Sequence, residues 1–237
     1  MTLNQDDVGS NQIVPSNNRK ENIKMNTYHK IQTVFLRDPK TKFKTLLEGQ
    51  FAKFEFEYLA ELMWAWTEKV DGTNIRVQYD SDEKSLNFNG KTDRAQLQAT
   101  LFEYLTETFT PKKQLFMDTF DKENVKVCLY GEGYGPRIQK GGGLYRKDQS
   151  FVLFDVKIND WWLKRGDVEN IGHKFGIDVV PIIRHGNLYE MVEFVRNGFN
   201  SQWGDFLAEG IVARPFVDLR ARSGERIITK LKCKDFV

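Results

Sequence analysis

The sequence predicts an α+β fold, with largely antiparallel sheets flanked by helices. Segments with the composition of strands come in runs and do not alternate regularly with helices, which argues against a doubly wound parallel sheet. The chain has 237 residues, of which 40% are hydrophobic and 29% charged, as in an ordinary globular domain. Residues 1–26 are rich in Asn, Asp, Gln and Ser, so we expect them to form a disordered tail. Because we find no internal repeat and no linker in the rest, we expect one domain at 27–237.

The first strands are expected on either side of an Asp-Gly pair. WAWTEKV (64–70) and NIRVQYD (74–80) have the aromatic and β-branched content of strands, and Asp71-Gly72 between them is typical of a tight turn that joins two strands. Before them, KIQTVF (30–35) begins the structured part of the chain. After them, SLNFNG (85–90) alternates apolar and polar residues and ends at a turn.

Helices are expected where apolar residues recur every three or four positions. AQLQATLFEYLTETF (95–109) has Leu101 and Leu105 at this spacing, and LYEMVEFVRNGF (188–199) ends near a glycine. DVENIGHKFGI (167–177) is a third helical segment. The remaining strands are expected at 124–133, 151–158, 209–215 and 226–236.

Composition excludes several classes of protein. No apolar run approaches the length of about 18 residues that a transmembrane helix needs, so we expect no membrane partner, and the N-terminus lacks the apolar core of a signal peptide. Cys128 and Cys233 are too few for a disulfide framework, so we expect a cytoplasmic protein. The three histidines have no ligand spacing among themselves or with the cysteines, which argues against a zinc site.

Basic residues gather in two acid-poor segments, although the formal net charge is only +2. Residues 133–147 include four basic residues and no acidic one, and residues 220–234 include six basic residues and one acidic residue. A single run of this kind is usually a solvated face. Two of them in a near-neutral chain suggest a surface that binds phosphate groups.

Lys69, in TEKVDGTNIRV (67–77), is the most informative residue. Taken alone, it is a lysine at a strand end beside an Asp-Gly turn. It follows the apolar strand WAW (64–66), however, where a free ammonium is costly to bury. We therefore expect burial and nearby cations to lower its pKa, which would expose a nucleophilic amine. The turn at Asp71-Gly72 would leave room for a phosphate beside this amine.

Six short motifs in a fixed order resemble those of the covalent nucleotidyltransferases, the superfamily of ATP-dependent DNA ligases, RNA ligases and mRNA capping enzymes. K-x-D-G at 69–72 resembles their nucleophile motif. The other five motifs follow in the order that the superfamily has: GKTDR (90–94), LYGEGYG (129–135), FVLFDV (151–156), EGIVARP (209–215) and ITKLKCKDF (228–236).

Asn74, two residues after K-x-D-G, resembles one branch of this superfamily. Capping enzymes and DNA ligases usually have Arg there, whereas RNA ligases of the RNA ligase 2-like branch have Asn. HKIQTVFLRD (29–38) and GEGYGPRIQKGG (131–142) also look like phage and bacterial members of that branch. The resemblance implies a nucleotidyltransferase catalytic domain with an ATP-grasp-like arrangement. Since the sequence stops three residues after Lys234, we expect no OB-fold.

The resemblance implies an ATP-dependent RNA ligase that joins RNA 3′-hydroxyl and 5′-phosphate ends in RNA repair, with ATP and Mg²⁺ (or Mn²⁺) as cofactors. Three alternatives stay open: an ATP-dependent DNA ligase, an mRNA guanylyltransferase-like enzyme, and a non-enzymatic nucleic-acid-binding module. The last would explain the basic segments but not the ordered carboxylates Glu132 and Glu209. It also stays open whether the substrate is a nicked duplex and whether a protein partner replaces the absent C-terminal domain.

Residue roles follow from the same resemblance. Lys69 would form a lysyl-AMP intermediate, and Glu209 would hold the metal. Lys230 and Lys232 alternate along one strand and would clamp the α-phosphate; Lys232 and Lys234 form a second K-x-K pair, but Phe236 favours the first. These four residues, Lys69, Glu209, Lys230 and Lys232, are the expected catalytic residues. The expected nucleotide-binding residues are Glu132 at the ribose hydroxyls, Phe154 against adenine (with Phe151 as the alternate), Arg94 at the ribose or the 5′-phosphate, Asn74 near the reacting phosphates, Lys230, Lys232 and, on weaker grounds, Glu68, Lys30 and Gln32.

Overall fold

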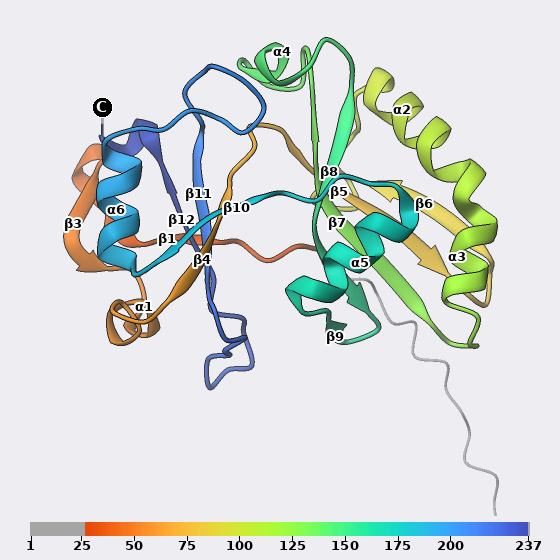
Figure 1. The fold of residues 1–237 in the computed structure, drawn as a ribbon, viewed down its shortest axis with the longest axis horizontal. Helices are drawn as coiled ribbons and strands as arrows, with labels where there is room; N and C mark the ends of the chain where they lie inside the picture. Colours follow the sequence, from red (N-terminus) through yellow and green to blue (C-terminus); the bar gives the residue numbers. More distant parts are fainter. Residues whose placement is uncertain (1–26, 237) are drawn as a thin grey trace, which may run out of the picture.

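Two five-stranded sheets stand side by side in the structure, a computed structural model that describes residues 27–236 (Figure 1). The first sheet has the strand order β1 (Gln32–Thr33), β12 (Thr229–Lys232), β11 (Gly210–Pro215), β4 (Trp64–Glu68) and β10 (Ile182–Gly186). The second has the order β6 (Ser85–Asn89), β5 (Thr73–Asp80), β7 (Lys126–Tyr134), β8 (Ser150–Ile158) and β9 (Trp161–Trp162). Within residues 27–236, the pairings in these two sheets are antiparallel except that of β1 with β12, and neither sheet closes into a barrel. The predicted α+β class is confirmed.

Each sheet has its own hydrophobic core and its own helices. Trp64 and Trp66 of β4 are fully buried and share the core of the first sheet with Met191 of α6. The core of the second sheet includes Phe109 of α2 and Phe175 of α5. The helices are α1 (Phe54–Tyr58), α2 (Ala99–Phe109), α3 (Lys113–Thr119), α4 (Gly142–Tyr145), α5 (Arg165–Phe175) and α6 (Leu188–Arg196), with short 3-10 turns η1 (Pro39–Thr41), η2 (Thr110–Lys112) and η3 (Cys233–Phe236).

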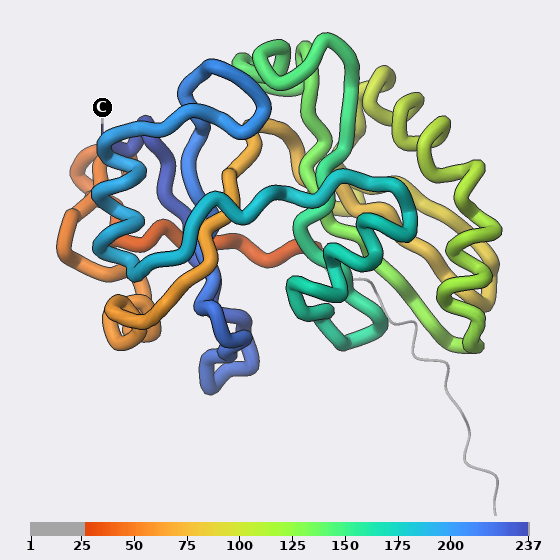
Figure 2. The backbone as a smooth tube through the Cα atoms, viewed as in Figure 1, coloured from red at the N-terminus to blue at the C-terminus, as the bar shows by residue number. Residues whose placement is uncertain are grey.

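The expected turn at Asp71-Gly72 does not join two strands of one sheet. β4 pairs with β10 and β11, whereas β5 pairs with β6 and β7. Residues 69–72 therefore carry the chain from the first sheet to the second, as Figure 2 shows in the orange-to-yellow part of the tube. Gly72 serves this crossing through close packing, because a Cβ there would lie 2.3 Å from the Gly133 carbonyl oxygen of β7. The prediction of a tight turn between paired strands is wrong at this point.

Most other predicted elements are present, with shifted ends. The helix expected from residue 95 begins at Ala99, and the strand expected at 226–236 is limited to β12 and is followed by η3. The expected tail at 1–26 lies outside the described residues. Elements that the pattern did not predict are β3 (Leu46–Phe51), which pairs with β2 (Phe35–Arg37), and α1, α3, α4, β9 and β10.

Candidate active site

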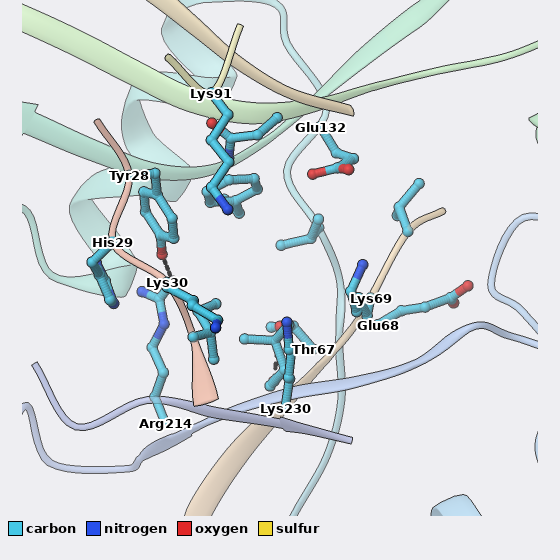
Figure 3. A pocket seen from close by; sticks show the side chains of 16 residues that line it. Tyr28, His29, Lys30, Thr67, Glu68, Lys69, Lys91, Glu132, Arg214 and Lys230 are labelled. Carbon is cyan, nitrogen blue, oxygen red and sulfur yellow. Dashed lines mark hydrogen bonds between the residues drawn. The ribbon is translucent and has the colours of Figure 1, made fainter. Parts of the chain in front are cut away.

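A cavity of about 190 Å³ lies between the two sheets, where β4 ends. Its wall is built from the segment 28–31, the end of β4, and residues of β5, β7, β8, β11 and β12. Figure 3 shows that lysine and carboxylate side chains from different strands meet around this space. The crossing between the sheets thus brings together residues that are far apart in the sequence.

Lys69 lies at the start of the crossing. Its backbone N–H donates to the Gly210 carbonyl at 2.8 Å, and its Nζ donates to Glu209 Oε2 at 2.7 Å. Burial lowers the pKa of Lys69, but the carboxylates of Glu209 and Glu132 raise it by more, so the net direction is upward. The expectation of a lowered pKa is therefore wrong for this arrangement, because acids and not cations dominate at the amine.

Glu209, which directly precedes β11, joins lysines from two strands. Its Oε1 accepts from Lys232 Nζ of β12 at 2.6 Å, while its Oε2 accepts from Lys69. The carboxylate is 11% exposed, so water screens these ion pairs only partly. The three side chains form a cation–anion–cation row next to the cavity, which of the three only Lys69 lines.

Lys230 lines the cavity on the same side of β12 as Lys232. Burial and the positive charges of Lys69, Lys232 and Lys91 lower the pKa of Lys230 to about 8. An anion bound in the cavity would relieve this excess of positive charge. Lys230 and Lys232 both lie on β12, whereas Lys234 lies after the end of this strand, in η3, and is exposed.

Glu132 and Asn74 are opposite each other on the paired strands β7 and β5, and both line the cavity. Burial is the main reason why the pKa of Glu132 is raised to about 7; Lys69 opposes the rise, and Glu209 and Asp71 add to it. Asn74 Oδ1 is buried and has no hydrogen-bond partner within residues 27–236. A bound ligand that donates a hydrogen bond would satisfy this oxygen.

Phe154 of β8 is the expected aromatic residue that does line the cavity, where its ring meets the Tyr28 ring edge-on at 5.1 Å. Phe151, the alternate, is 2% exposed and packs edge-on against Phe109 in the core of the second sheet. It does not line the cavity, and its ring lies against Gly131 of the paired strand β7, where a Cβ would lie 2.2 Å from the ring.

Tyr28 and Arg214 are cavity residues that the sequence reasoning missed. The Tyr28 hydroxyl donates to Asp155, and the same buried carboxylate accepts from Arg214 and Arg226. Arg214 was inside the motif EGIVARP, but nothing in its spacing distinguishes a residue that faces the cavity from one that faces solvent. Tyr28 carries no sequence signal, because its role depends on a carboxylate 127 residues away.

Two expected nucleotide-binding residues do not present their charged groups to the cavity. Glu68 lines the cavity, but its carboxylate points away (Figure 3) and accepts from Ser201 Oγ at 2.6 Å and from the Gln202 N–H at 2.7 Å. Arg94 is exposed in the loop after β6 and does not line the cavity. Lys91 of the same loop lines it instead. Of the weaker candidates, Lys30 lines the cavity and Gln32 does not.

The two basic segments come together only in part. Residues 133–147 run through α4 beside the K-x-D-G segment, where Gln139 Nε2 donates to the Gly72 carbonyl at 3.2 Å. In the segment 220–234, Lys230 lines the cavity and Lys232 pairs with Glu209. The loop between β11 and β12, which includes Arg220 and Arg222, projects from the opposite edge of the molecule (Figure 1). Of the second segment, only the part on β12 therefore lies near the cavity.

No protein-only metal site is visible in the described part of the chain: residues 27–236 hold no group of three or more His, Cys, Asp and Glu side chains that could bind a metal ion. Glu209 does not itself line the cavity, and lysines occupy both of its oxygens. None of the helices that the structure describes is long and apolar enough to cross a membrane.

The sequence matches a known family over most of its length. The model of the family described as RNA ligase matches residues 62–232, which include the K-x-D-G segment, Glu209 and both lysines of β12. A comparison with curated proteins finds no match.

Solved structures of Naegleria gruberi RNA ligase are similar to this fold. A point mutant without ligand has a TM-score of 0.58 at 17% identity, over 77% of this chain and 52% of the other. A point mutant with ATP and Mn has a TM-score of 0.58 at 16% identity, over 90% of this chain and 62% of the other. The complex with PPi has a TM-score of 0.57 at 17% identity, over 88% and 60%. The chain thus spans between half and two thirds of the length of the structures that it resembles, and the likeness shows a shared fold.

Proposed function

The chain belongs to the RNA ligase family, and on this premise we propose that it is an ATP-dependent RNA ligase that joins 3′-hydroxyl and 5′-phosphate ends through a covalent lysyl-AMP intermediate. One observation carries the proposal: Lys69, the lysine of K-x-D-G, lines a cavity together with Lys230 and Glu132, and is paired with Glu209. A phosphate-binding lysine cluster beside a single reactive amine is what nucleotidyl transfer needs.

Four features suit the cavity to a nucleotide. Burial and the repulsion of neighbouring lysines lower the pKa of Lys230 to about 8, so a polyphosphate would stabilise these cations. Asn74 Oδ1 is buried without a partner in the described residues, and a ligand group could satisfy it. Phe154 gives the wall an aromatic ring on which a base could stack. Glu132, which also lines the cavity, would accept from hydroxyl groups of a ribose.

In the first step, the neutral amine of Lys69 attacks the α-phosphorus of ATP. The nitrogen–phosphorus bond forms as the bond from this phosphorus to the pyrophosphate oxygen breaks, and pyrophosphate leaves with the electron pair. Before this, Lys69 has to lose the proton that its pairing with Glu209 stabilises. Lys230 and Lys232 would hold the phosphate oxygens in position and offset their charge.

In the second and third steps, RNA ends replace the lysine. An oxygen of the RNA 5′-phosphate attacks the phosphorus of the lysyl adduct. The nitrogen–phosphorus bond breaks as the nitrogen takes up a proton from water, so that Lys69 leaves as an amine. A 3′-hydroxyl oxygen then attacks the phosphorus of the adenylylated 5′ end, loses its proton and displaces AMP, which leaves a phosphodiester bond. A nicked duplex is one arrangement that presents both ends together, and a protein partner that holds the two ends is another.

A divalent cation, Mg²⁺ or Mn²⁺, would neutralise charge on the phosphate oxygens when bound. Glu209 would hold it, with water and phosphate oxygens as the other ligands that such an ion prefers. Because both Glu209 oxygens hold lysines, the ion would compete with Lys69 and Lys232 for this carboxylate. Solved Naegleria gruberi RNA ligase structures that contain ATP and Mn agree with this proposal.

The test is covalent labelling with ATP. With ATP and magnesium, the intact mass should rise by one AMP, Lys69→Ala should abolish the rise, and Lys53→Ala, which removes a lysine paired with Glu225 outside the cavity, should not. No adduct with ATP, GTP or NAD would refute the proposal. Labelling by GTP alone would indicate a guanylyltransferase-like enzyme, and equal sealing of DNA and RNA ends would indicate a DNA ligase.

A further inference from the structure

The hydroxyl of Tyr145 holds the backbone directly after Lys69. Tyr145 is the last residue of α4, in the segment between β7 and β8, and its Oη accepts from the Asp71 N–H at 3.1 Å. It is 7% exposed. Asp71 is two residues beyond Lys69, inside the crossing between the sheets, where the described ladders of neither sheet include it. The phenol therefore replaces the strand partner that this peptide N–H lacks.

Aromatic rings hold Tyr145 itself in place. Its ring meets Tyr134 edge-on at 5.8 Å, Trp203 at 5.9 Å and Phe206 at 4.9 Å. Val70, the residue between Lys69 and Asp71, packs in the same cluster. Burial raises the pKa of the Tyr145 phenol, so the hydroxyl stays neutral at physiological pH. A neutral phenol held in this way can accept the Asp71 N–H at a fixed position.

The residue before Lys69 is anchored to the same aromatic group. Glu68 accepts from Ser201 Oγ and the Gln202 N–H, and Ser201 Oγ in turn accepts from the Trp203 N–H at 3.1 Å. Lys69 is thus held from both sides: through Glu68 and the loop before β11, and through Asp71 and Tyr145. Tyr145 contacts both of these parts, since its ring packs against Trp203 and its hydroxyl binds Asp71.

We propose that Tyr145 is a positioning residue for Lys69, acting through the Asp71 amide; this rests on the proposed lysine adenylylation. Without Oη, the half-buried Asp71 N–H loses this partner, and the crossing can shift to find another acceptor. A small displacement of the amine from the line of attack lowers the rate of the chemical step, whereas the cavity that binds the nucleotide stays intact.

Tyr145→Phe tests this, with Tyr134→Phe as the matched control. Both variants keep the ring and lose one hydroxyl from the same cluster, but the Tyr134 hydroxyl accepts from Trp203 Nε1 at 3.1 Å and does not contact residues 69–72. For Tyr145→Phe we expect the single-turnover rate of adenylylation at saturating ATP to fall between about tenfold and a hundredfold, with an unchanged ATP concentration at half-maximal rate. For Tyr134→Phe we expect less than about a threefold change in rate, because losing one hydrogen bond there costs stability and not alignment.

Hydrogen exchange gives a readout that needs no activity. The Asp71 amide should exchange at least about tenfold faster in Tyr145→Phe and at the wild-type rate in Tyr134→Phe. Equal rates of adenylylation in wild type and Tyr145→Phe would overturn the inference, and so would equal losses in the two variants. If the wild-type protein forms no adduct, the proposed function is wrong, and the inference falls with it. If the wild type forms the adduct but the two variants behave alike, only the inference about Tyr145 is wrong.

Discussion

The amine of Lys69 and the carboxylate of Glu209 form an ion pair 2.7 Å long at the point where the chain passes from one sheet to the other. The same carboxylate is 2.6 Å from Lys232. An ammonium so paired has no lone pair with which to attack phosphorus. The residue that carries the proposed chemistry is therefore held in its unreactive protonation state until the proton leaves or the pair opens.

Replacing Glu209 with Gln should lower the pKa of Lys69. The carboxylate favours the ammonium, so its removal leaves burial, which disfavours the charge, opposed only by Glu132 and Asp71. The pH profile for acylation of Lys69 by an amine-selective reagent, followed without nucleotide, should move to lower pH. Glu225→Gln, which removes a carboxylate paired with Lys53 on the surface, should leave the profile unchanged. A profile that stays in place or moves to higher pH in Glu209→Gln would contradict the interpretation.

Lys232→Ala should lower the rate of adenylylation at least about tenfold, which corresponds to a loss of about 1.4 kcal/mol of transition-state stabilisation. Lys234→Ala is the matched control, because Lys234 is two residues away but exposed in η3. We expect it to have a smaller effect. If Lys234 proves essential and Lys230 proves dispensable, then Lys232 and Lys234 are the functional pair, and the assignment from β12 is wrong.

The motifs along the sequence predicted several of the residues that meet at the cavity. Glu132, Phe154 and Lys230 line it, because each sits on a strand whose alternation fixes the face that its side chain occupies. Lys69 also lines it, directly after the end of β4. The fold class could also be predicted from the sequence, because strands follow one another in runs without regular helical crossovers between them.

Contacts between distant parts of the chain could not be predicted. The Asp-Gly signal describes local backbone preference, but the partners of β4 and β5 depend on strands that come more than 100 and about 50 residues later. The pKa of Lys69 was misjudged for the same reason, since burial is visible in the apolar run WAW but the nearness of Glu209 and Glu132 is not. Glu68 likewise turned out to bind a loop near residue 201.

Asp155→Asn should destabilise the fold. Its buried carboxylate accepts from Tyr28, Arg214 and Arg226 and joins the segment before β1 to β8 and β11. Removing the charge leaves two guanidinium groups without their anion, which typically costs about 3–5 kcal/mol. Urea unfolding should show this loss. Asp160→Asn should leave the midpoint unchanged, because that side chain is 81% exposed and its contact to Lys157 is long.

The pH dependence of the same network follows from the pKa of Asp155. Burial alone would raise it, but Arg214 and Arg226 hold it well below its ordinary value. A carboxylate with a depressed pKa contributes stability above its unfolded-state pKa of about 3.9, and the contribution is lost as pH falls below that value. Wild-type stability should therefore fall steeply below about pH 4. The fall should be shallower in Asp155→Asn, and an equally steep fall would show that other carboxylates account for it.

RNA binding should depend on the basic residues of 133–147, next to Lys69, and not on Arg220 and Arg222 in the β11–β12 loop. Lys140 and Lys147 lie in the segment whose Gln139 and Tyr145 bind the backbone of Gly72 and Asp71, so RNA that reaches Lys69 passes close to them. Arg220 and Arg222 lie in the loop between β11 and β12, at the opposite end of the molecule (Figure 1). All four side chains are exposed, so two double substitutions to Ala remove the same charge from different places.

The salt dependence of binding separates these two segments. Each phosphate contact contributes about 0.7 to the slope of log affinity against log salt for a single strand, because neutralised phosphates release counterions. The variant without Lys140 and Lys147 should lose about 1.4 from this slope, measured by titration of a labelled 5′-phosphorylated RNA, and the variant without Arg220 and Arg222 should keep the wild-type slope. Adenylylation by ATP should change little with salt in all three proteins, since its charges lie in a partly buried cavity that salt screens less. A loss of slope in the Arg220 and Arg222 variant alone would place the RNA at the β11–β12 loop and would contradict this prediction.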